Sequence, residues 1–304
     1  MSSEPPRRAP LCVGIGEVLW DCLPAGRRLG GAPANVAAHA AQLGARGAVV
    51  SAVGDDADGR EVRAELRARG VETAGIRTVP DLPTGQVDVA LDAAGVPVYT
   101  IRAPAAWDAL ECDAAIEAIA GAADAAIYGT LAQRDPRSRD AIRAFLRAVR
   151  PGCLRVFDVN IRPPFLAAEA VREGLVQANV LKLNESELPA VRDIAGIGAH
   201  APDPLRALLD RFELRVAVCT LGARGSRIVT PEGESRQPGV PATIVDTVGA
   251  GDAFTAAVTV GLLRGLPLDR IQDLANRVAA FVCSQAGAVP RLPRPLAEAF
   301  GPES

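Results

Sequence analysis

The sequence predicts an α/β fold with a doubly wound, mostly parallel central sheet flanked by helices, and a small β lid. The order strand, loop, helix recurs along the 304 residues, which is the pattern of parallel α/β sheets. One segment departs from this order with a period of two, which indicates a hairpin outside the main sheet. A hydrophobic content of 49% is enough to bury a large core.

The first half of the chain opens with a short apolar strand that breaks at Gly14-Ile15-Gly16 into a loop continuing to Gly31. An Ala-rich stretch with helical spacing follows, then a second apolar strand and an amphipathic helix whose Arg and Glu residues face outward. The expected elements are a strand over residues 11–15, a helix over 35–43, a strand over 48–53 and a helix over 59–69.

The hairpin is expected between residues 84 and 101, where apolar residues such as Val87 and Val89 alternate with polar ones and residues 92–95 form a turn. After it, strands and helix-compatible stretches alternate again. Such sheets bind ligands at the carboxyl ends of their strands, where several polar clusters lie. The later strands are expected over residues 125–128, 155–158, 180–183 and 216–220.

We find no linker rich in Pro, Gly and Ser that would divide the chain. Residues 1–304 are therefore predicted to form a single domain, with lid segments at about residues 17–34 and 84–106.

The composition excludes several classes of function. A net charge of -3 gives no basic footprint for nucleic acid. The six cysteines contain no Cys-x-x-Cys pair, so we expect reduced thiols rather than a zinc site or disulfides. Residues 1–10 are polar, and no window approaches the length of a membrane helix. A cytoplasmic protein without a membrane partner is expected. Lys182 is the one lysine among 33 basic residues, a bias that we attribute to a high-GC genome.

The segment with the most specific chemistry is a glycine-rich loop that leads into an apolar helix. Backbone N–H groups of Gly249, Ala250 and Gly251 can point at one anion, and the helix dipole adds partial positive charge there. Asp252, in the first turn of the helix, is well located to accept a proton from an attacking hydroxyl. The alternative is that Asp252 only caps the helix.

Residues 246–252 resemble the Asp-Thr-x-Gly-Ala-Gly-Asp signature of the ribokinase-like sugar kinases, also called the phosphofructokinase-B family. Residues 30–37, Gly-Gly-Ala-Pro-Ala-Asn-Val-Ala, resemble the N-terminal sugar-binding signature of that family. The resemblance extends from about Leu11 to Pro293. It implies a ribokinase-like fold and an ATP-dependent carbohydrate kinase whose catalytic base is Asp252.

The resemblance also assigns residues to the sugar. Asp21, Gly30, Gly31 and Asn35 match family positions that bind the sugar, the alternative being a turn in which Asn35 is an N-cap. Two arginines are further candidates for substrate contacts, Arg102 in the lid and Arg162.

Arg162 belongs to residues 158–163, which resemble an Asp-x-Asn-x-Arg motif of fructokinase-like members and could contact sugar or phosphate. The alternative for this motif is a surface ion pair between Asp158 and Arg162.

A nucleotide site is implied by three further motifs. Asn184 and Glu187 match the Asn-x-x-Glu motif that holds Mg²⁺ and its waters in this family. The same two residues could instead form a capping box at a helix start, and both can be true. The residues matched to the nucleotide itself are Thr220, Gly222, Gly225 and, in the adenine pocket, Asn276, for which an exposed helical position is the alternative.

Many members of the family bind a monovalent cation beside the phosphate loop, mostly through backbone carbonyls. The last ligand position, often Ser, falls on Arg291 here, so a requirement for K⁺ stays open. The matching positions are Asp246, Val248, Val282, Gln285 and Gly287.

The lid most resembles that of bacterial fructokinases, so ATP, Mg²⁺ and D-fructose are the expected partners, with a homodimer through the lid as a further possibility. The alternatives are a kinase for another sugar such as 2-keto-3-deoxygluconate or ribose, and a catalytically idle sensor of sugar or nucleotide. A dinucleotide-dependent oxidoreductase is suggested by Gly14-Ile15-Gly16, but the Gly-x-Gly-x-x-Gly fingerprint is incomplete because Leu19 occupies the position of its third glycine.

Overall fold

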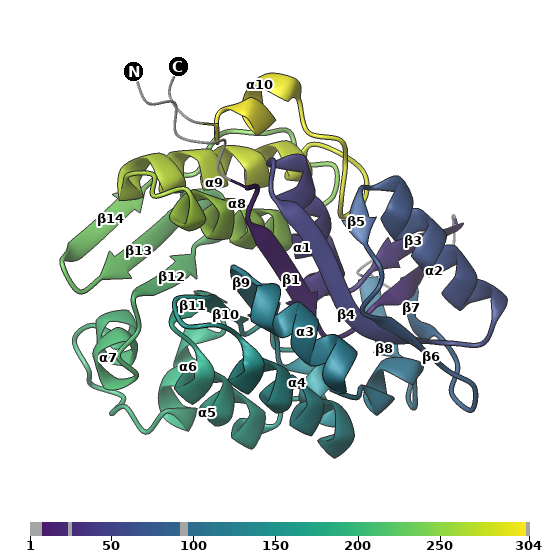
Figure 1. The fold of residues 1–304 in the computed structure, drawn as a ribbon. Coiled ribbons are helices and arrows are strands. Elements are labelled where there is room, and N and C mark those ends of the chain that lie inside the picture. The colour runs from purple at the N-terminus through teal and green to yellow at the C-terminus, as the bar shows by residue number, and fades with distance from the viewer. Residues whose placement is uncertain (1–7, 24–25, 92–96, 302–304) are drawn as a thin grey trace, which may run out of the picture.

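The computed structural model describes residues 8–23, 26–91 and 97–301, which form two sheets and the helices around them (Figure 1). The strands of the large sheet are β1 (Leu11–Ile15), β4 (Arg46–Gly54), β5 (Val71–Glu72), β6 (Ile76–Val79), β9 (Ala125–Tyr128), β10 (Leu154–Asp158), β11 (Val180–Asn184), β12 (Val216–Thr220), β13 (Ser226–Thr230) and β14 (Gly233–Gln237).

The large sheet has the order β14-β13-β12-β11-β10-β9-β1-β4-β5, and β6 also pairs with β4. All its pairings are parallel except those of β13 with β12 and β14. The expected mostly parallel sheet is therefore confirmed. Four strands at or near the ends of this sheet, β5, β6, β13 and β14, were not expected, because they are short or partly exposed and lack a continuous apolar run.

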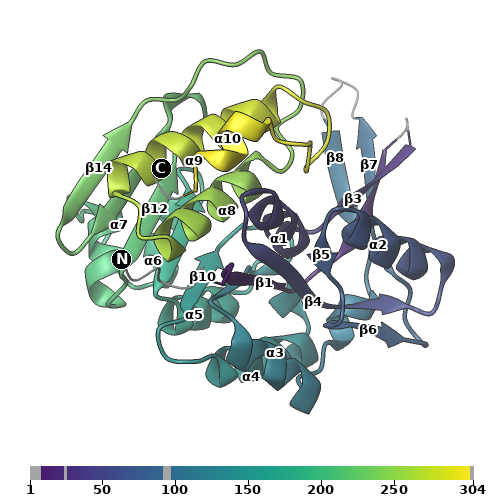
Figure 2. The same cartoon turned by 45° about the horizontal axis from the view of Figure 1, so that its top comes forward.

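Helices cover both faces of this sheet (Figures 1 and 2). Successive residues of a strand point to opposite faces, so Leu11, Val13 and Ile15 face one helical layer while Cys12 faces the other. The helices are α1 (Ala32–Gln42), α2 (Ala57–Ala68), α3 (Ala114–Ala122), α4 (Pro136–Ala148), α5 (Ala168–Gln177), α6 (Leu188–Ile194), α7 (Pro204–Arg211), α8 (Ala250–Leu263), α9 (Leu268–Cys283) and α10 (Arg294–Glu298), with short 3₁₀ turns at η1 (Ala106–Ala109), η2 (Leu131–Arg134) and η3 (Gly222–Arg224).

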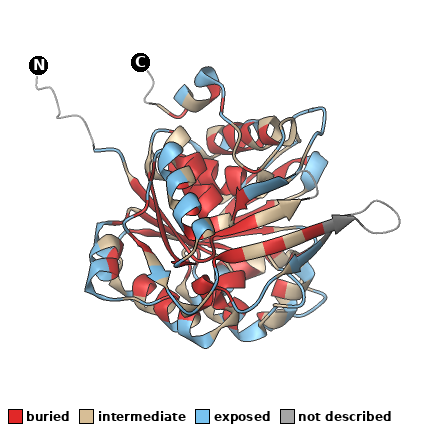
Figure 3. Ribbon diagram, turned by 90° about the vertical axis from the view of Figure 1, so that its right-hand side faces the viewer, coloured by how far each residue is buried: buried red, intermediate tan, exposed pale blue. Residues whose placement is uncertain are grey.

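The two helical layers have separate apolar cores. Helices α1, α8, α9 and α10 bury their apolar residues on one face, and α3 to α7 bury theirs on the other. Helix α8 is buried almost all round, as expected for a helix without a polar face. Figure 3 shows the buried residues gathered in the sheet and on the inner sides of the helices.

The small sheet stands beside the large one, next to α1 and α2 (Figure 2). Its strands are β2 (Leu19–Leu23), β3 (Gly26–Gly30), β7 (Gly85–Leu91) and β8 (Pro97–Ile101), in the order β3-β2-β7-β8. The hairpin outside the main sheet is thus confirmed, with Val87 and Val89 buried. The expected turn at residues 92–95 lies outside the described residues. The expected loop up to Gly31 is wrong, since two short strands form there.

Helix α1 joins the beginning of the chain to its end. His39 Nε2 lies 2.9 Å from the carbonyl oxygen of Ala288. The side chain of Gln42 donates to Pro290 O at 3.1 Å and accepts from Leu292 N–H at 2.8 Å. Helix α1 also packs beside α8 (Figure 2). This contact brings the first turns of the two helices together.

The six cysteines are free thiols within the described residues. In the same part of the chain, no helix combines the length and the apolar character needed to cross a membrane.

Candidate active site

The glycine-rich loop shapes the N-terminus of α8. Gly249 is the N-cap and has a φ of 80°, and a Cβ there would clash with the backbone of Ala288. Only glycine meets both conditions without strain. The N–H of Ala250 makes a long bond of 3.4 Å to Thr247 O. The expected start of a long helix is therefore confirmed, and one of the three amides, that of Ala250, is partly engaged; anion binding there stays a prediction.

Asp252 lies in the first turn of α8 and is 9% exposed. Its Oδ2 accepts a hydrogen bond of 2.8 Å from Asn35 Nδ2, on the first turn of α1. The two capping alternatives are wrong, because α8 is capped by Gly249 and α1 by Gly31, without a side-chain bond in either case. The catalytic and sugar-binding signatures therefore meet at one pair of side chains.

Burial raises the pKa of Asp252 from 3.8 to about 6, and the carboxylate of Asp158 adds to this rise. The hydrogen bond from Asn35 and the positive charges of Lys182 and Arg162 lower it. A carboxylate with a pKa near 6 is largely ionised at neutral pH and is a better proton acceptor than an exposed one.

Lys182 lies directly beneath the anion loop. Its Nζ donates to both oxygens of Asp158, at 2.9 and 3.1 Å, and Thr255 Oγ1 donates to Asp158 Oδ2 at 2.7 Å. A Cβ added to Gly251 would stand 3.1 Å from the same Nζ. Burial lowers the pKa of Lys182, but the charges of Asp158 and Glu187 outweigh it, and the net direction is upward.

From the sequence alone we give this ammonium group no role, because we attribute the scarcity of lysine to a high-GC genome. The expected surface ion pair of Asp158 with Arg162 is wrong, since Asp158 is buried and pairs with Lys182. The available signal was the position of the one lysine, near the end of a strand and two residues before Asn184.

Asp21 and the two glycines of the N-terminal signature adjoin the same cluster, and we call this the sugar side because these residues were matched to the sugar. Burial raises the pKa of Asp21 to about 6, with Arg162 lowering it and the carboxylates of Asp252 and Asp246 raising it. A Cβ at Gly30 would overlap the Asp21 carboxylate, and Gly31 has a φ of 105°. These glycines let the chain pass close to the acidic side chains.

Glu17 is a second residue that the sequence did not single out. Its side chain is buried, Oε1 accepts from Ala32 N–H at 3.3 Å, and Oε2 has no hydrogen-bond partner among the described residues. Burial raises the pKa of Glu17 to about 7. A Glu directly after an apolar strand was the signal that could have identified it.

The two arginines proposed for the substrate are placed differently. Arg162 is exposed after β10, and its charge lowers the pKa of both Asp21 and Asp252, so it lies within electrostatic reach of them. Arg102 instead binds Asp88 through two bonds of 2.8 and 2.7 Å. Asp88 pairs with Cys22 across β2 and β7, so it points to the face of the small sheet opposite Asp21. The structure does not bring Arg102 to Asp252.

The residues expected to hold the nucleotide gather at the ends of β11 and β12, where Asn184 and Thr220 are direct partners. Gly222 and Gly225 have φ values of 59° and 94° and shape the turn η3. Asn276 is not an exposed helical residue. Its side chain is buried and accepts from Ser226 Oγ at 3.0 Å.

Asn184 and Glu187 form the reciprocal bonds of a capping box. Asn184 Oδ1 accepts from Glu187 N–H at 3.0 Å, and Glu187 Oε2 accepts from Asn184 N–H at 2.9 Å. Ile161 N–H donates to Glu187 Oε1 at 2.8 Å. Each carboxylate oxygen thus keeps a lone pair for a water molecule. Because Mg²⁺ is commonly held through waters and phosphate oxygens, these residues fit an indirect hold of the ion.

Among the five positions matched to a monovalent cation, Val248 and Gly287 hydrogen-bond the carboxylate of Asp246. Its Oδ1 accepts from Val248 N–H and its Oδ2 from Gly287 N–H, both at 3.0 Å. The carbonyl of Val282 accepts from Gln285 N–H, also at 3.0 Å.

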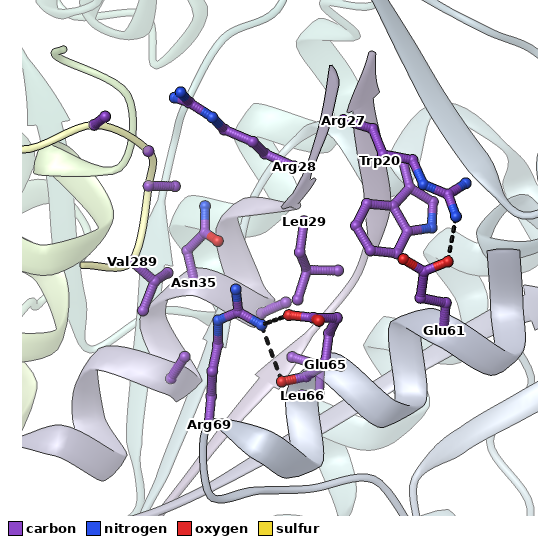
Figure 4. A pocket seen from close by; sticks show the side chains of 15 residues that line it. Trp20, Arg27, Arg28, Leu29, Asn35, Glu61, Glu65, Leu66, Arg69 and Val289 are labelled. Carbon is purple, nitrogen blue, oxygen red and sulfur yellow. Dashed lines mark hydrogen bonds and ion pairs between the residues drawn. The ribbon is translucent and has the colours of Figure 1, made fainter. Parts of the chain in front are cut away.

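A cavity of about 320 Å³ lies behind Asn35, between β3, α1, α2 and residues 286–289 (Figure 4). Asp252 is not among its lining residues. Figure 4 shows that ion pairs of Arg27 with Glu61 and of Arg69 with Glu65 border it. The cavity therefore adjoins the contact of Asn35 with Asp252 but does not include Asp252.

Comparisons with known proteins agree with this geometry. The model of the pfkB family of carbohydrate kinases matches residues 22–295. The chain is 31% identical to fructokinase-1 of Oryza sativa subsp. japonica over 317 residues, covering 94% of this chain and 95% of the relative. It is 29% identical to the fructokinase of Salmonella typhimurium, covering 92% and 95%. A sugar kinase of Pyrococcus horikoshii, solved in complex with ATP, superposes with a TM-score of 0.81 at 26% identity and covers 95% of this chain and 99% of that one.

Proposed function

This chain belongs to the pfkB family of carbohydrate kinases and is an ATP-dependent phosphotransferase, and from this premise we propose that it phosphorylates D-fructose. The observation that carries phosphoryl transfer to a sugar hydroxyl is the contact between Asn35 and Asp252. It joins a residue of the sugar-binding signature to the residue matched to the catalytic base.

Asp252 takes the proton of the primary hydroxyl of the sugar, and the resulting oxygen attacks the γ-phosphorus of ATP. The bond from phosphorus to the bridging oxygen breaks, and ADP leaves. Asn35 holds the Asp252 carboxylate through its Nδ2 and thereby orients it. The pKa of about 6 leaves Asp252 ionised and ready to accept this proton at neutral pH.

The groups beneath and beside Asp252 stabilise negative charge as it develops on the transferred phosphoryl group. The N-terminus of α8 offers backbone N–H groups. Lys182 adds an ammonium group beneath Gly251 that needs no reorganisation, since Asp158 already holds it. We infer that Asn184 and Glu187 hold Mg²⁺ through water, where the ion would neutralise charge on the nucleotide phosphates.

The charge of the sugar side favours a neutral substrate. Asp21 and Asp252, each with a pKa of about 6, are mostly ionised at neutral pH, whereas Glu17, with a pKa of about 7, is ionised only in part. Their carboxylates suit the hydroxyls of a neutral sugar and repel a sugar acid, which argues for fructose over 2-keto-3-deoxygluconate. The names of the two curated relatives favour fructose over ribose. The small sheet acts as the lid of this site.

A coupled assay of ADP release with a panel of acceptors tests the proposal. Fructose, ribose, 2-keto-3-deoxygluconate, tagatose-6-phosphate and adenosine are compared by kcat/KM, and we expect the highest value for fructose. A higher value for any other acceptor would refute fructose while leaving the kinase assignment intact. An idle sensor would bind sugar or nucleotide and turn over none of the panel. The homodimer through the lid stays a prediction, testable by sedimentation.

A further inference from the structure

A third donor reaches the carboxylate of Asp246, in addition to two backbone N–H groups. Arg28 Nη1 lies 3.1 Å from Asp246 Oδ2, the oxygen that also accepts from Gly287 N–H. The side chain of Asp246 is 21% exposed and that of Arg28 is 45% exposed. The guanidinium of Arg28 thus lies beside the glycine-rich loop and contacts Asp246, one of the positions matched to a monovalent cation.

Arg28 comes from the small sheet, 218 residues away from Asp246 in the sequence. It pairs with Asp21 across β2 and β3, so the two side chains share the face of the sheet that looks toward the active site. A Cβ at Gly287 would lie 3.6 Å from Arg28 Cδ. The arginine therefore extends over this turn at ordinary van der Waals distance.

The neighbouring Arg27 takes the opposite direction. It lies on the other face of β3, over the ring of Trp20, and pairs with Asp58 and Glu61 of α2. Figure 4 shows the two arginines diverging, with Arg27 directed to Glu61 and Arg28 directed away from it. Arg27 is therefore a matched control for Arg28. Replacing either arginine removes one positive charge from β3, but only replacing Arg28 removes the contact with Asp246.

The carboxylate of Asp246 does not fit a potassium ion here. Three donors already use Asp246, and the carbonyl of Val282 is used by Gln285 N–H. A carboxylate has about four acceptor sites, so little capacity remains for a metal. A K⁺ ion bound to Asp246 would also lie close to a guanidinium of the same charge, which repels it.

We propose that Arg28 supplies, beside Asp246, the positive charge that a bound K⁺ would supply, so that phosphoryl transfer by this chain is independent of monovalent cations. The contact also ties β3, and with it the sugar-facing side of the small sheet, to the loop that precedes α8. The inference rests on the carbohydrate kinase activity of the family and not on the identity of the sugar.

The test compares wild type, Arg28→Met, Arg28→Lys and the control Arg27→Met in KCl and in tetramethylammonium chloride at equal ionic strength. We expect the kcat/KM of wild type, of Arg28→Lys and of Arg27→Met to change less than about twofold between the salts. For Arg28→Met we expect a loss of about fivefold in tetramethylammonium chloride, the upper range for a part-exposed ion pair. Potassium should restore part of this loss.

Thermal unfolding gives a second measurement that needs no substrate. A cation that binds only the folded state raises Tm, so we expect KCl to raise the Tm of Arg28→Met and of none of the other three proteins. The inference is overturned if wild type needs K⁺ for activity or is stabilised by it specifically, if Arg28→Met matches wild type in both salts, or if Arg28→Lys behaves like Arg28→Met. If no sugar of the panel is turned over, the proposed substrate fails, and the unfolding measurement still decides the role of Arg28.

Discussion

Replacing Asp252 by Asn is expected to abolish turnover and, at the same time, to stabilise the fold. The amide cannot accept the proton of the sugar hydroxyl, so kcat should fall by about 10²- to 10⁴-fold. Nucleotide binding should be retained. The stabilisation is expected because the substitution removes a buried charge whose pKa is raised by desolvation and by the nearby carboxylate of Asp158.

The size of this effect follows from the pKa. Burial raises it from 3.8 to about 6, and at about 1.4 kcal/mol per pH unit the ionised carboxylate costs the fold about 3 kcal/mol at neutral pH. The favourable contributions of Lys182 and Arg162 are already included in that pKa. Some of the gain is lost because the Asn side chain makes a weaker hydrogen bond with Asn35, so we expect a net gain of about 1 to 3 kcal/mol.

The pH dependence has a definite sign. The folded state binds the proton more tightly than the unfolded state, so stability of the wild type falls as pH rises from about 4 to about 6. The advantage of Asp252→Asn should therefore be absent below about pH 4 and complete above about pH 6. Urea denaturation at several pH values measures it.

The matched control is Asp55→Asn, at an aspartate whose side chain is 69% exposed. It should change stability by less than about 0.5 kcal/mol at every pH. An Asp252→Asn protein that is less stable than wild type at neutral pH, or that still releases ADP in a sugar-dependent way, would refute the reasoning.

Three further predictions follow from the same cluster. Lys182→Met should destabilise the fold by about 3 to 5 kcal/mol, because Asp158 is left buried without its partner, and adding Asp158→Asn should restore stability but not turnover in parallel denaturation and kinetic measurements; a double variant as active as wild type would contradict this. Gly249→Ala should weaken ATP binding in calorimetry and destabilise the fold by more than about 1 kcal/mol, since the φ of 80° and the adjacent backbone leave no room for a methyl group; unchanged affinity would contradict it. The kcat/KM should fall as pH decreases through about 6, with a slope above one because Asp21 and Asp252 both titrate there; a flat profile down to pH of about 5 would contradict a carboxylate base.

Six strands of the large sheet, β1, β4 and β9 to β12, could be predicted because each contains a continuous apolar run bounded by turn residues. The small sheet was predicted only in part. Strands β2 and β3 are five residues each and half-exposed at their outer ends, so their pattern is too short to show a period.

In the site, too, residues that are contiguous in the sequence could be predicted, and contacts that depend on strand pairing could not. The glycine-rich loop and Asp252 are contiguous in the sequence and could be identified there. The pairing of Asp158 with Lys182 depends on the alignment of β10 with β11, in which the two are direct partners. The direction of Arg102 depends on the pairing of β2 with β7, which local sequence does not specify.

The contact of α1 with α8 and with residues 288–292 has a consequence for how the chain folds. Asn35 and Asp252 are separated by 217 residues, and Gln42 and Leu292 by 250. Non-local contacts of this kind slow folding, since a long loop must close before they form. During synthesis, α1 leaves the ribosome together with β1 and β4, against which it also packs, but the side that contacts α8 stays uncovered until the last part of the chain emerges. Enzymatic activity should therefore be among the last signals to return on refolding, after helix content and after most of the sheet.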